Sequence, residues 1–195
     1  MNFQIIAIII LLLFYGCYFS KMLNQKKRGI QTDQMGKGKK GFVKFIETAL
    51  KIASISIPIT EIISIAINTG HLPSQARYAG SVIALLGDMV FICSVLTMRD
   101  SWRAGVSATD KTELVTNGIY QISRNPAFLG FDLVYIGILL MFFNWFLFAV
   151  SAFAIFMFHL QIVNVEESFL RSAFGDEYLN YSKKVHRYIG RKIDR

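Results

Sequence analysis

Residues 133–163 read LVYIGILLMFFNWFLFAVSAFAIFMFHLQIV, a run of 31 residues without Asp, Glu, Lys or Arg. As one α-helix this run would extend roughly 46 Å, at about 1.5 Å per residue, whereas the hydrocarbon core of a bilayer is about 30 Å thick. Two shorter helices that turn near residues 142–145 fit better, because Asn144 favours a turn and Trp145 suits a membrane interface. The run therefore predicts a helical hairpin within a membrane.

The composition of the whole 195-residue chain is that of a membrane protein. Hydrophobic residues make up 53%, charged residues 17%, and the mean hydropathy is +0.43, outside the range of ordinary soluble domains. Three further apolar segments precede the hairpin: residues 3–19, 52–70 and 79–98. The first has no basic leader and no small-residue cleavage site, so we expect a retained span. We predict an all-α polytopic membrane protein with about five transmembrane helices, the last two forming a tight hairpin.

Lys and Arg gather in three of the segments outside these spans. Residues 21–44 contain eight of them, residues 99–124 four and residues 171–195 seven, whereas residues 71–78 contain only Arg77. Because cytoplasmic connections collect Lys and Arg, five spans with an outside amino terminus place all three basic segments in the cytoplasm. Four or six spans would break this agreement. We therefore expect the carboxyl terminus and the active site on the cytoplasmic side.

Nucleic acid and metal ions are not expected as partners. The net charge of +8 and the 17 Phe and 8 Tyr could suggest base stacking, but most Phe lie within the spans, where they indicate lipid contact and core packing. Cys17 and Cys93 both lie in apolar runs, and His159 has no His or Cys at ligand spacing. These residues predict neither a disulfide framework nor a metal site.

Three carboxylates, Glu61, Asp88 and Asp132, lie in or at the edge of the apolar spans. A carboxylate at that depth is costly unless it is paired or faces water, so each is a candidate functional group. The simpler interpretation is an interhelical hydrogen bond or, for Asp132, exposure at the interface. Their roles stay open at this point.

Two polar segments carry the candidate chemistry. Residues 114–130 read LVTNGIYQISRNPAFLG, with a turn signal at Asn117–Gly118, Pro126 suited to start a helix, and a final glycine that permits close backbone approach. Residues 166–181 read EESFLRSAFGDEYLNY. If residues 133–163 turn back on themselves, both segments flank one opening on the cytoplasmic face.

Such an opening suits a zwitterionic ligand with an apolar part, of which S-adenosylmethionine is an example. Its carboxylate needs a cation such as Arg124, its ammonium needs an acceptor such as Glu166, and its adenine needs an apolar slot. On these residues alone the stronger alternative is that they are interfacial charges, with Arg171 paired to Glu167 at (i, i+4) spacing.

The motifs LVTNGIY, RNPAFLG, the Glu166–Glu167 pair and FGDEY resemble, in this order, the isoprenylcysteine carboxyl methyltransferase family and its phospholipid methyltransferase relatives. The resemblance covers about residues 112–188. It implies a membrane-embedded helical domain that binds S-adenosylmethionine from the cytosol and methylates a lipid-like or prenylated acceptor. We expect one domain over residues 1–195, with amino-terminal spans in 1–100 and a catalytic core with the hairpin in 101–195.

We expect two catalytic residues: Arg124 would position a carboxylate of cofactor or substrate, and Glu167 would shape the same pocket. The resemblance adds a role for Glu166, which would take the amino group of the cofactor. It also implies the full set of cofactor-binding residues, namely Thr112, Glu113, Leu114, Val115, Tyr120, Asn125, Pro126, Ala127, Phe128 and Glu166.

The chain departs from the family pattern at three positions. Asn125 and Phe128 replace a usual His and Tyr; Asn can still donate a hydrogen bond and Phe keeps the ring. Ile162 stands where prenylcysteine enzymes carry an Arg for the substrate carboxylate, so the acceptor atom, whether carboxylate oxygen, amine nitrogen or thiol sulfur, stays open. The alternatives are phospholipid N-methylation, an NADPH-dependent membrane reductase and a non-enzymatic membrane scaffold.

Overall fold

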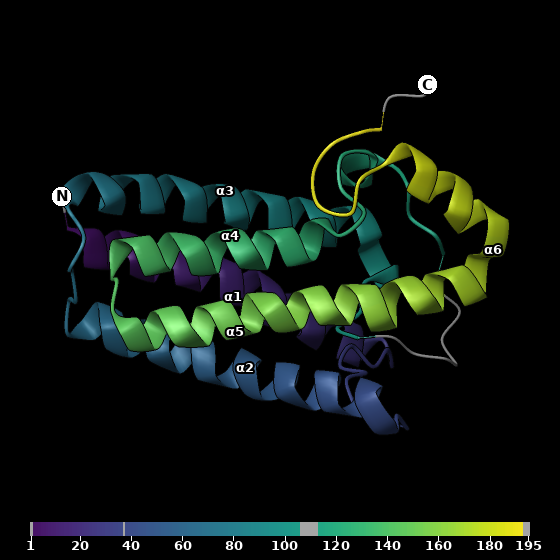
Figure 1. Cartoon of the computed structure of the whole chain (residues 1–195), viewed down its shortest axis with the longest axis horizontal. Coiled ribbons are helices and arrows are strands. Elements are labelled where there is room, and N and C mark those ends of the chain that lie inside the picture. Colours follow the sequence, from purple (N-terminus) through teal and green to yellow (C-terminus); the bar gives the residue numbers. More distant parts are fainter. Residues whose placement is uncertain (1, 37, 106–112, 193–195) are drawn as a thin grey trace.

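The computed structural model describes residues 2–36, 38–105 and 113–192, and this part of the chain is helical. Its long helices lie side by side along one axis (Figure 1): α1 (Phe3–Lys27), α2 (Gly41–Ala66), α3 (Ser74–Met98), α4 (Pro126–Met141) and α5 (Trp145–Gln161). Within these ranges there are two isolated β-bridges and no strand. The prediction of an all-α fold is confirmed.

Three shorter helical segments and one more helix complete the described chain. They are two 3₁₀ turns, η1 (Arg99–Ser101) and η2 (Gly118–Gln121), a π-helical segment, η3 (Ile162–Glu166), and α6 (Glu167–Lys184). Helix α6 continues α5 beyond the bundle and then turns back over its end (Figure 1). The turn lies at Gly175, whose φ of 48° is left-handed and favours glycine.

Four helical stretches of the described chain are long and apolar enough to cross a membrane: Phe3–Lys27, Gly41–Ala66, Ser74–Ser101 and Trp145–Lys184. Helix α4 is apolar but has only 16 residues, which extend roughly 24 Å. The first two helices extend beyond the apolar windows 3–19 and 52–70 at their charged ends. Backbone hydrogen bonding continues past the lipid-facing residues, so hydropathy marks the span and not the helix boundary.

The turn between α4 and α5 falls at residues 142–144. Pro126 occupies the first turn of α4, and the side chain of Asn144 accepts a hydrogen bond from the Leu147 amide at 2.9 Å, which caps α5. Helix α4 packs mainly against α3, and α5 packs mainly against α2, while α4 and α5 contact each other less. The turn therefore joins two pairs of packed helices.

Helices α3 and α4 approach closely because glycines face each other across their contact. A Cβ atom added to Gly137 would lie 2.6 Å from the Ala84 Cβ and 2.6 Å from the carbonyl oxygen of Gly80. Seven residues earlier in α4, a Cβ added to Gly130 would lie 3.0 Å from the carbonyl oxygen of Gly87. Small residues allow such close packing between membrane helices. The close backbone approach expected of Gly130 is confirmed.

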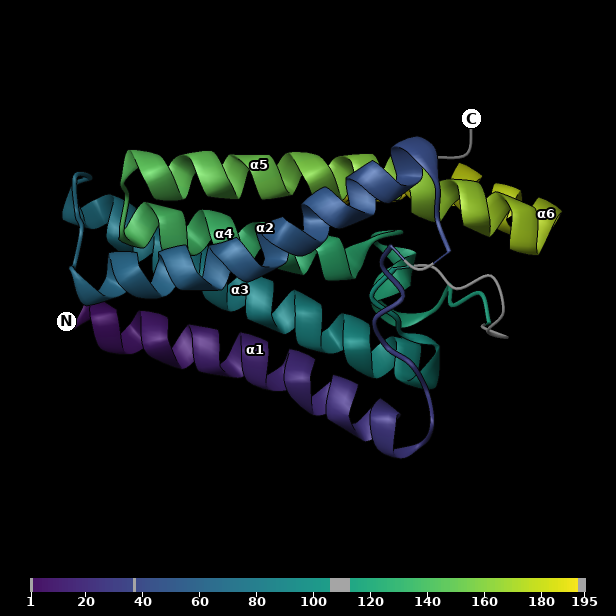
Figure 2. The ribbon, with the colours of Figure 1, turned by 90° about the horizontal axis from the view of Figure 1, so that it is seen from below.

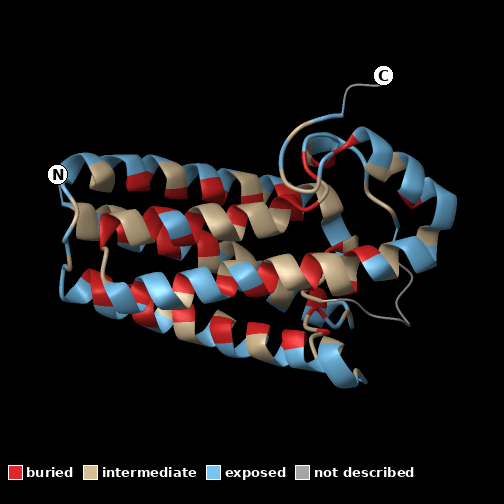
Figure 3. Ribbon diagram, in the orientation of Figure 1, coloured by how far each residue is buried: buried red, intermediate tan, exposed pale blue. Residues whose placement is uncertain are grey.

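The faces of the helices differ in burial as a membrane bundle requires. Buried residues lie where the helices face one another, and exposed residues lie on the outward faces (Figure 3). Many outward residues are large and apolar; Leu12 on α1, for example, is 68% exposed. Apolar outward faces suit contact with lipid tails rather than water.

All the segments rich in Lys and Arg lie at one end of the bundle, which we call the basic end. The described parts of these segments, residues 28–36, 38–40, 99–105, 113–125 and 185–192, gather there (Figures 1 and 2). The opposite end holds the amino terminus and the connections 67–73 and 142–144. Helix α2 crosses obliquely between these ends (Figure 2).

The three carboxylates of the spans have different surroundings. Glu61 is fully buried and accepts a hydrogen bond from the Tyr15 hydroxyl at 3.2 Å, which links α2 to α1. Both oxygens of Asp88 and Oδ1 of Asp132 have no hydrogen-bond partner among the described residues. Only Glu61 therefore follows the expectation of an interhelical hydrogen bond.

Candidate active site

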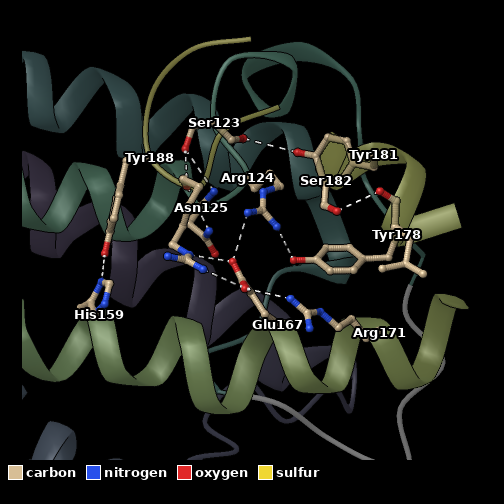
Figure 4. Close-up of polar contacts among 12 residues, drawn as sticks. Ser123, Arg124, Asn125, His159, Glu167, Arg171, Tyr178, Tyr181, Ser182 and Tyr188 are labelled. Carbon is tan, nitrogen blue, oxygen red and sulfur yellow. Dashed lines mark hydrogen bonds and ion pairs between the residues drawn. The ribbon is translucent and has the colours of Figure 1, made fainter. Parts of the chain in front are cut away.

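Glu167, the first residue of α6, is surrounded by three guanidinium groups at the basic end (Figure 4). Arg187 donates from Nε to Oε1 at 2.7 Å and from Nη2 to Oε2 at 3.1 Å. Arg124 Nη2 lies 3.2 Å from Oε1, and Arg171 Nη2 lies 3.7 Å from Oε2. The side chain of Glu167 is only 4% exposed. One buried carboxylate thus faces three cations, which leaves a local excess of positive charge.

The (i, i+4) pair of Arg171 and Glu167 exists, but it is the weakest of these contacts. The Arg171 side chain is 62% exposed, and an exposed ion pair at this distance contributes little. Arg124, in contrast, is 9% exposed, and Arg187 binds both carboxylate oxygens. Charge-assisted and bidentate hydrogen bonds are the strong class. Glu167 is therefore held by residues on other segments and is more than an interfacial charge.

Arg124 is fixed between two groups. Its Nη1 donates to the Tyr178 hydroxyl at 2.7 Å, in addition to its contact with Glu167, and its buried Nε has no hydrogen-bond partner among the described residues. Tyr178 reaches this position because α6 turns back at Gly175. The two residues predicted to be catalytic, Arg124 and Glu167, therefore lie in one cluster. Their catalytic roles stay a prediction.

Residues 185–192, which we call the C-terminal strap, lie over the loop before α4. The amide of Arg124 donates to the carbonyl of His186 at 3.1 Å, and the Asn125 side chain donates to the carbonyl of Arg187 at 3.1 Å. The Gly190 amide closes the pairing with a hydrogen bond to Ile122 at 2.7 Å. The strap thus fixes both the backbone of Arg124 and the side chain of Asn125.

Two side chains of the strap reach the helices. The Tyr188 hydroxyl lies 2.6 Å from Nδ1 of His159 on α5 (Figure 4), so His159 is a hydrogen-bonded residue. The hydrogen bond to Glu167 raises the pKa of the Arg187 guanidinium, which keeps this cation charged. Arg187 was not among the site residues predicted from the sequence. Its partner lies 20 residues away, and among seven basic residues near the end of the chain nothing distinguishes it.

Tyr120 is buried beside this cluster, and both its hydroxyl and its carbonyl form hydrogen bonds. Its hydroxyl lies 2.8 Å from the Ser94 hydroxyl, and its carbonyl accepts a hydrogen bond from Tyr181 at 2.6 Å. Burial raises the pKa of Tyr120 above its ordinary value, and the charge of Glu166 adds to the effect. A neutral, hydrogen-bonded Tyr120 can shape a pocket but is not a base.

The adjacent carboxylates Glu166 and Glu167 have separate partners. Glu166 closes the π-helical segment η3, and its Oε1 accepts a hydrogen bond from Gln161 at 3.4 Å, while Glu167 faces the arginines. Single-turn π-helical segments inside α-helices are frequent at functional sites. The pair therefore provides one carboxylate neutralised by cations and one held only by a long hydrogen bond.

Two cavities open near these residues. The larger, of about 1130 Å³, lies between the end of α3 and the loop before η2, and its lining includes Glu113, Leu114 and Val115. The smaller, of about 500 Å³, is mainly apolar and lies among α1, α2, α4 and α5; its lining includes Ala127 and Phe128. The residues predicted to bind cofactor are therefore divided between two cavities.

The other predicted cofactor-binding residues line neither cavity within the described ranges. Tyr120, Asn125 and Glu166 form the hydrogen bonds given above, and Pro126 is buried at the start of α4. Thr112 lies outside the described residues. The cofactor-binding set stays a prediction, with its described members grouped at the basic end.

Comparison with known proteins adds independent information. Residues 76–177 match the model of a family described as phospholipid methyltransferase. A probable protein-S-isoprenylcysteine O-methyltransferase of Oryza sativa subsp. indica is 30% identical over 111 residues, which cover 56% of this chain and 58% of the relative. The protein-S-isoprenylcysteine O-methyltransferase of Saccharomyces cerevisiae is 30% identical over 108 residues, 54% of this chain and 45% of the relative.

A third relative shows the highest identity of the three over a shorter segment. The protein-S-isoprenylcysteine O-methyltransferase of Schizosaccharomyces pombe is 36% identical over 72 residues, 37% of this chain and 30% of the relative. The chain spans about half the length of the rice relative that it matches. The segment that matches the family model contains Arg124, Glu166 and Glu167, but not Arg187.

Proposed function

Because the chain belongs to the phospholipid methyltransferase family, we propose that it transfers a methyl group from S-adenosylmethionine to a lipophilic acceptor at the membrane. The proposed activity is of the isoprenylcysteine carboxyl methyltransferase type, which is the activity named for the relatives. The observation that carries the proposal is the arrangement at the basic end. There Arg124 pairs with Glu167, and the adjacent Glu166 accepts a hydrogen bond from Gln161, which lines the apolar cavity.

The buried polar groups of the cluster fit such a cofactor. Within the described part of the chain, the buried Nε of Arg124 has no partner, which suits a carboxylate, and the buried Oε1 of Gln161 beside Glu166 has none, which suits an ammonium. When bound, S-adenosylmethionine supplies an activated methyl group on a sulfonium. Arg124, Gln161 and Glu166 would hold it by its amino-acid end, where the carboxylate and the ammonium share one carbon.

Orientation and exclusion of water are the tasks of the protein in this reaction. Methyl transfer from a sulfonium is an in-line displacement, so its rate depends mainly on the alignment of the reacting groups in a dry site. The ion pairs of Glu167 and the strap hold Arg124 in place and cover the cluster. A carboxylate acceptor needs no base, whereas an amine or thiol acceptor must lose a proton.

The apolar cavity is the proposed place of the acceptor chain. Lys51 and Ile62 both line it and are eleven positions apart on the helix, so the cavity extends roughly 16 Å along α2. Phe19 on α1 and Ile55 on α2 line it and are also 50% and 59% exposed. A cavity bordered by exposed apolar residues can admit a lipid from the side, between α1 and α2.

The proposal includes an orientation in the membrane. Cytoplasmic segments are rich in Lys and Arg, so the basic end would face the cytosol and the amino terminus would face the outside. The cofactor would then enter from the cytosol and the acceptor from the lipid. The two would meet at the cytoplasmic membrane surface.

A cofactor panel tests the proposal directly. The purified full chain in lipid nanodiscs is titrated with S-adenosylhomocysteine and with NADPH by calorimetry. We expect saturable binding of S-adenosylhomocysteine, weakened roughly tenfold or more in Glu166→Gln and unchanged in Glu61→Gln, because only the first loses a charged hydrogen bond to the ligand. Binding of NADPH alone would indicate a reductase, and binding of neither would indicate a non-enzymatic protein.

A further inference from the structure

Three exposed lysines follow one another along α2 at the basic end, and we call them the basic stripe. Lys40 directly precedes the helix, and Lys44 and Lys51 lie four and eleven positions after it. Residues at this spacing lie on one side of a helix, and all three lysines are exposed. The stripe lies outside residues 76–177, the segment that matches the family model.

The basic stripe presents an excess of positive charge. Lys40 and Lys44 form no ion pair with another residue of the described chain. Lys51 Nζ lies 3.2 Å from Oδ2 of Asp33, but the two side chains are 50% and 35% exposed, so this pair contributes little. Glu47, the acidic residue of α2 closest in sequence to the stripe, is fully buried. The charge of the stripe is therefore available to an anion from outside the chain.

The stripe begins at the depth of the lipid headgroups. Helix α2 has 26 residues, which extend roughly 39 Å, whereas the hydrocarbon core is about 30 Å thick. Counted back from Ala66, about twenty residues cross the core, so Lys40 and Lys44 lie beyond it at the basic end. Lys51 lies about one turn inside the core, from where a long lysine side chain can still reach the headgroups.

Two aromatic side chains accompany the lysines in the first turns of α2. The rings of Phe42 and Phe45 are stacked, with centroids 6.4 Å apart, and the residues are 58% and 60% exposed. Aromatic rings beside lysines suit the boundary between headgroups and acyl chains, where the rings leave water and the cations meet phosphate. This combination favours a lipid surface over a soluble acidic partner.

The stripe leads to the side of the apolar cavity. Its last member, Lys51, lines this cavity, as does Ile55, one turn further along α2. Ile55 and, on α1, Phe19 are the exposed lining residues between which a lipid can enter. A lipid whose headgroup lies on the stripe therefore has its acyl chains at this entrance.

We propose that the basic stripe binds the headgroup of an anionic phospholipid, whose acyl chains lie beside the entrance between α1 and α2. Lysine binds phosphate as a point charge, which suits a mobile headgroup. A lysine near the membrane surface contributes about fivefold to the binding of anionic lipid. The inference concerns a bound lipid and goes beyond the proposed function, because it does not require that this lipid accept a methyl group.

Photochemical cross-linking tests the site on the full chain in phosphatidylcholine nanodiscs. Trace phosphatidylglycerol or phosphatidylcholine, each with a diazirine in one acyl chain, is activated by light, and labelled peptides are identified by mass spectrometry. We expect phosphatidylglycerol to label the peptides that contain Phe19 and Ile55 more than phosphatidylcholine does. The double variant Lys40→Gln/Lys44→Gln should reduce this preference roughly fivefold or more, and Lys40→Arg/Lys44→Arg should retain it.

The matched control is Lys183→Gln/Lys184→Gln, which removes two exposed lysines from the end of α6 and should retain the preference. If the stripe variant does not fold, salt carries the test: about 1 M salt shortens the Debye length to about 3 Å and should abolish the wild-type preference. Equal labelling of wild type by both lipids overturns the inference, as does an equal loss in the stripe variant and the control. Wild type that prefers phosphatidylglycerol but binds no S-adenosylhomocysteine contradicts the proposed function alone.

Discussion

Arg187 holds Glu167 with two hydrogen bonds, of 2.7 and 3.1 Å, and this pair ties the C-terminal strap to the first turn of α6. The same carboxylate also contacts Arg124, whose backbone amide bonds to the strap. The side chain and the backbone of Arg124 are thus both positioned by elements that lie beyond it in the chain. Folding of the strap and order at the candidate site are therefore coupled.

This coupling predicts that Arg187→Ala loosens the strap. A lost bidentate, charge-assisted hydrogen bond costs about 1.5 to 3 kcal/mol, so the amides of Arg124 and Gly190 should exchange with solvent roughly tenfold to a hundredfold faster. Hydrogen exchange with mass spectrometry measures this directly. Arg191→Ala, at an exposed position of the same strap, is the control. Equal protection in both variants would show that the backbone pairing alone holds the strap.

The glycine contact between α3 and α4 predicts a strong position effect. In Gly137→Ala the new Cβ would meet the Ala84 Cβ at 2.6 Å, so the helices must separate, at a cost of about 1 to 3 kcal/mol. Gly16→Ala on α1 has nothing within 4 Å of its new Cβ and should be neutral or slightly stabilising. Thermal unfolding in detergent compares the two variants. A Gly137→Ala protein as stable as Gly16→Ala would contradict the packing described here.

The basic end of the bundle predicts the topology. In a variant that lacks Cys17 and Cys93, single cysteines at positions 30 and 190 should react with a membrane-impermeant reagent from the cytoplasmic side. A cysteine at position 74 should react from the outside, because it follows the connection 67–73, which lies at the end opposite the basic end. Reaction of positions 30 and 190 from opposite sides would exclude five spans.

The uncharged side chain of Ile162 leads us to expect poor methylation of acceptors that carry a carboxylate. It is fully buried and uncharged at the position where the resemblance places a cation for the substrate carboxylate. Short prenylcysteine analogues should therefore be methylated weakly compared with extracted membrane lipids, measured as methyl incorporation into each. Efficient methylation of a farnesylcysteine analogue would show instead that Arg124 or Arg187 binds the carboxylate.

Much of the fold could be predicted because lipid imposes one simple pattern. The charge-free run 133–163 was too long for one span, and the structure divides it at residues 142–144, where Asn144 caps the next helix. Pro126 predicts the start of a helix and Gly130 predicts a close backbone approach, and the structure confirms both. Helix boundaries were less predictable, because helices continue past the apolar windows into charged residues.

The site was predictable only where its chemistry lies in contiguous motifs. Arg124 and Glu167 could be brought together by the predicted turn, and the structure does bring them together. Arg187 could not be selected, because its importance arises from a partner on another segment. A single sequence contains no signal for a long-range ion pair or for a buried oxygen without a partner.

The central claim is transfer of a methyl group from S-adenosylmethionine to a lipid, and a labelling experiment tests it most directly. The purified full chain in nanodiscs of extracted lipids is incubated with S-adenosylmethionine that carries a radioactive methyl group, and the organic phase is counted. We predict label in the lipid fraction for wild type and for Glu61→Gln, and roughly tenfold less for Glu166→Gln. Label in the wild-type organic phase no higher than with heat-denatured protein would contradict the account.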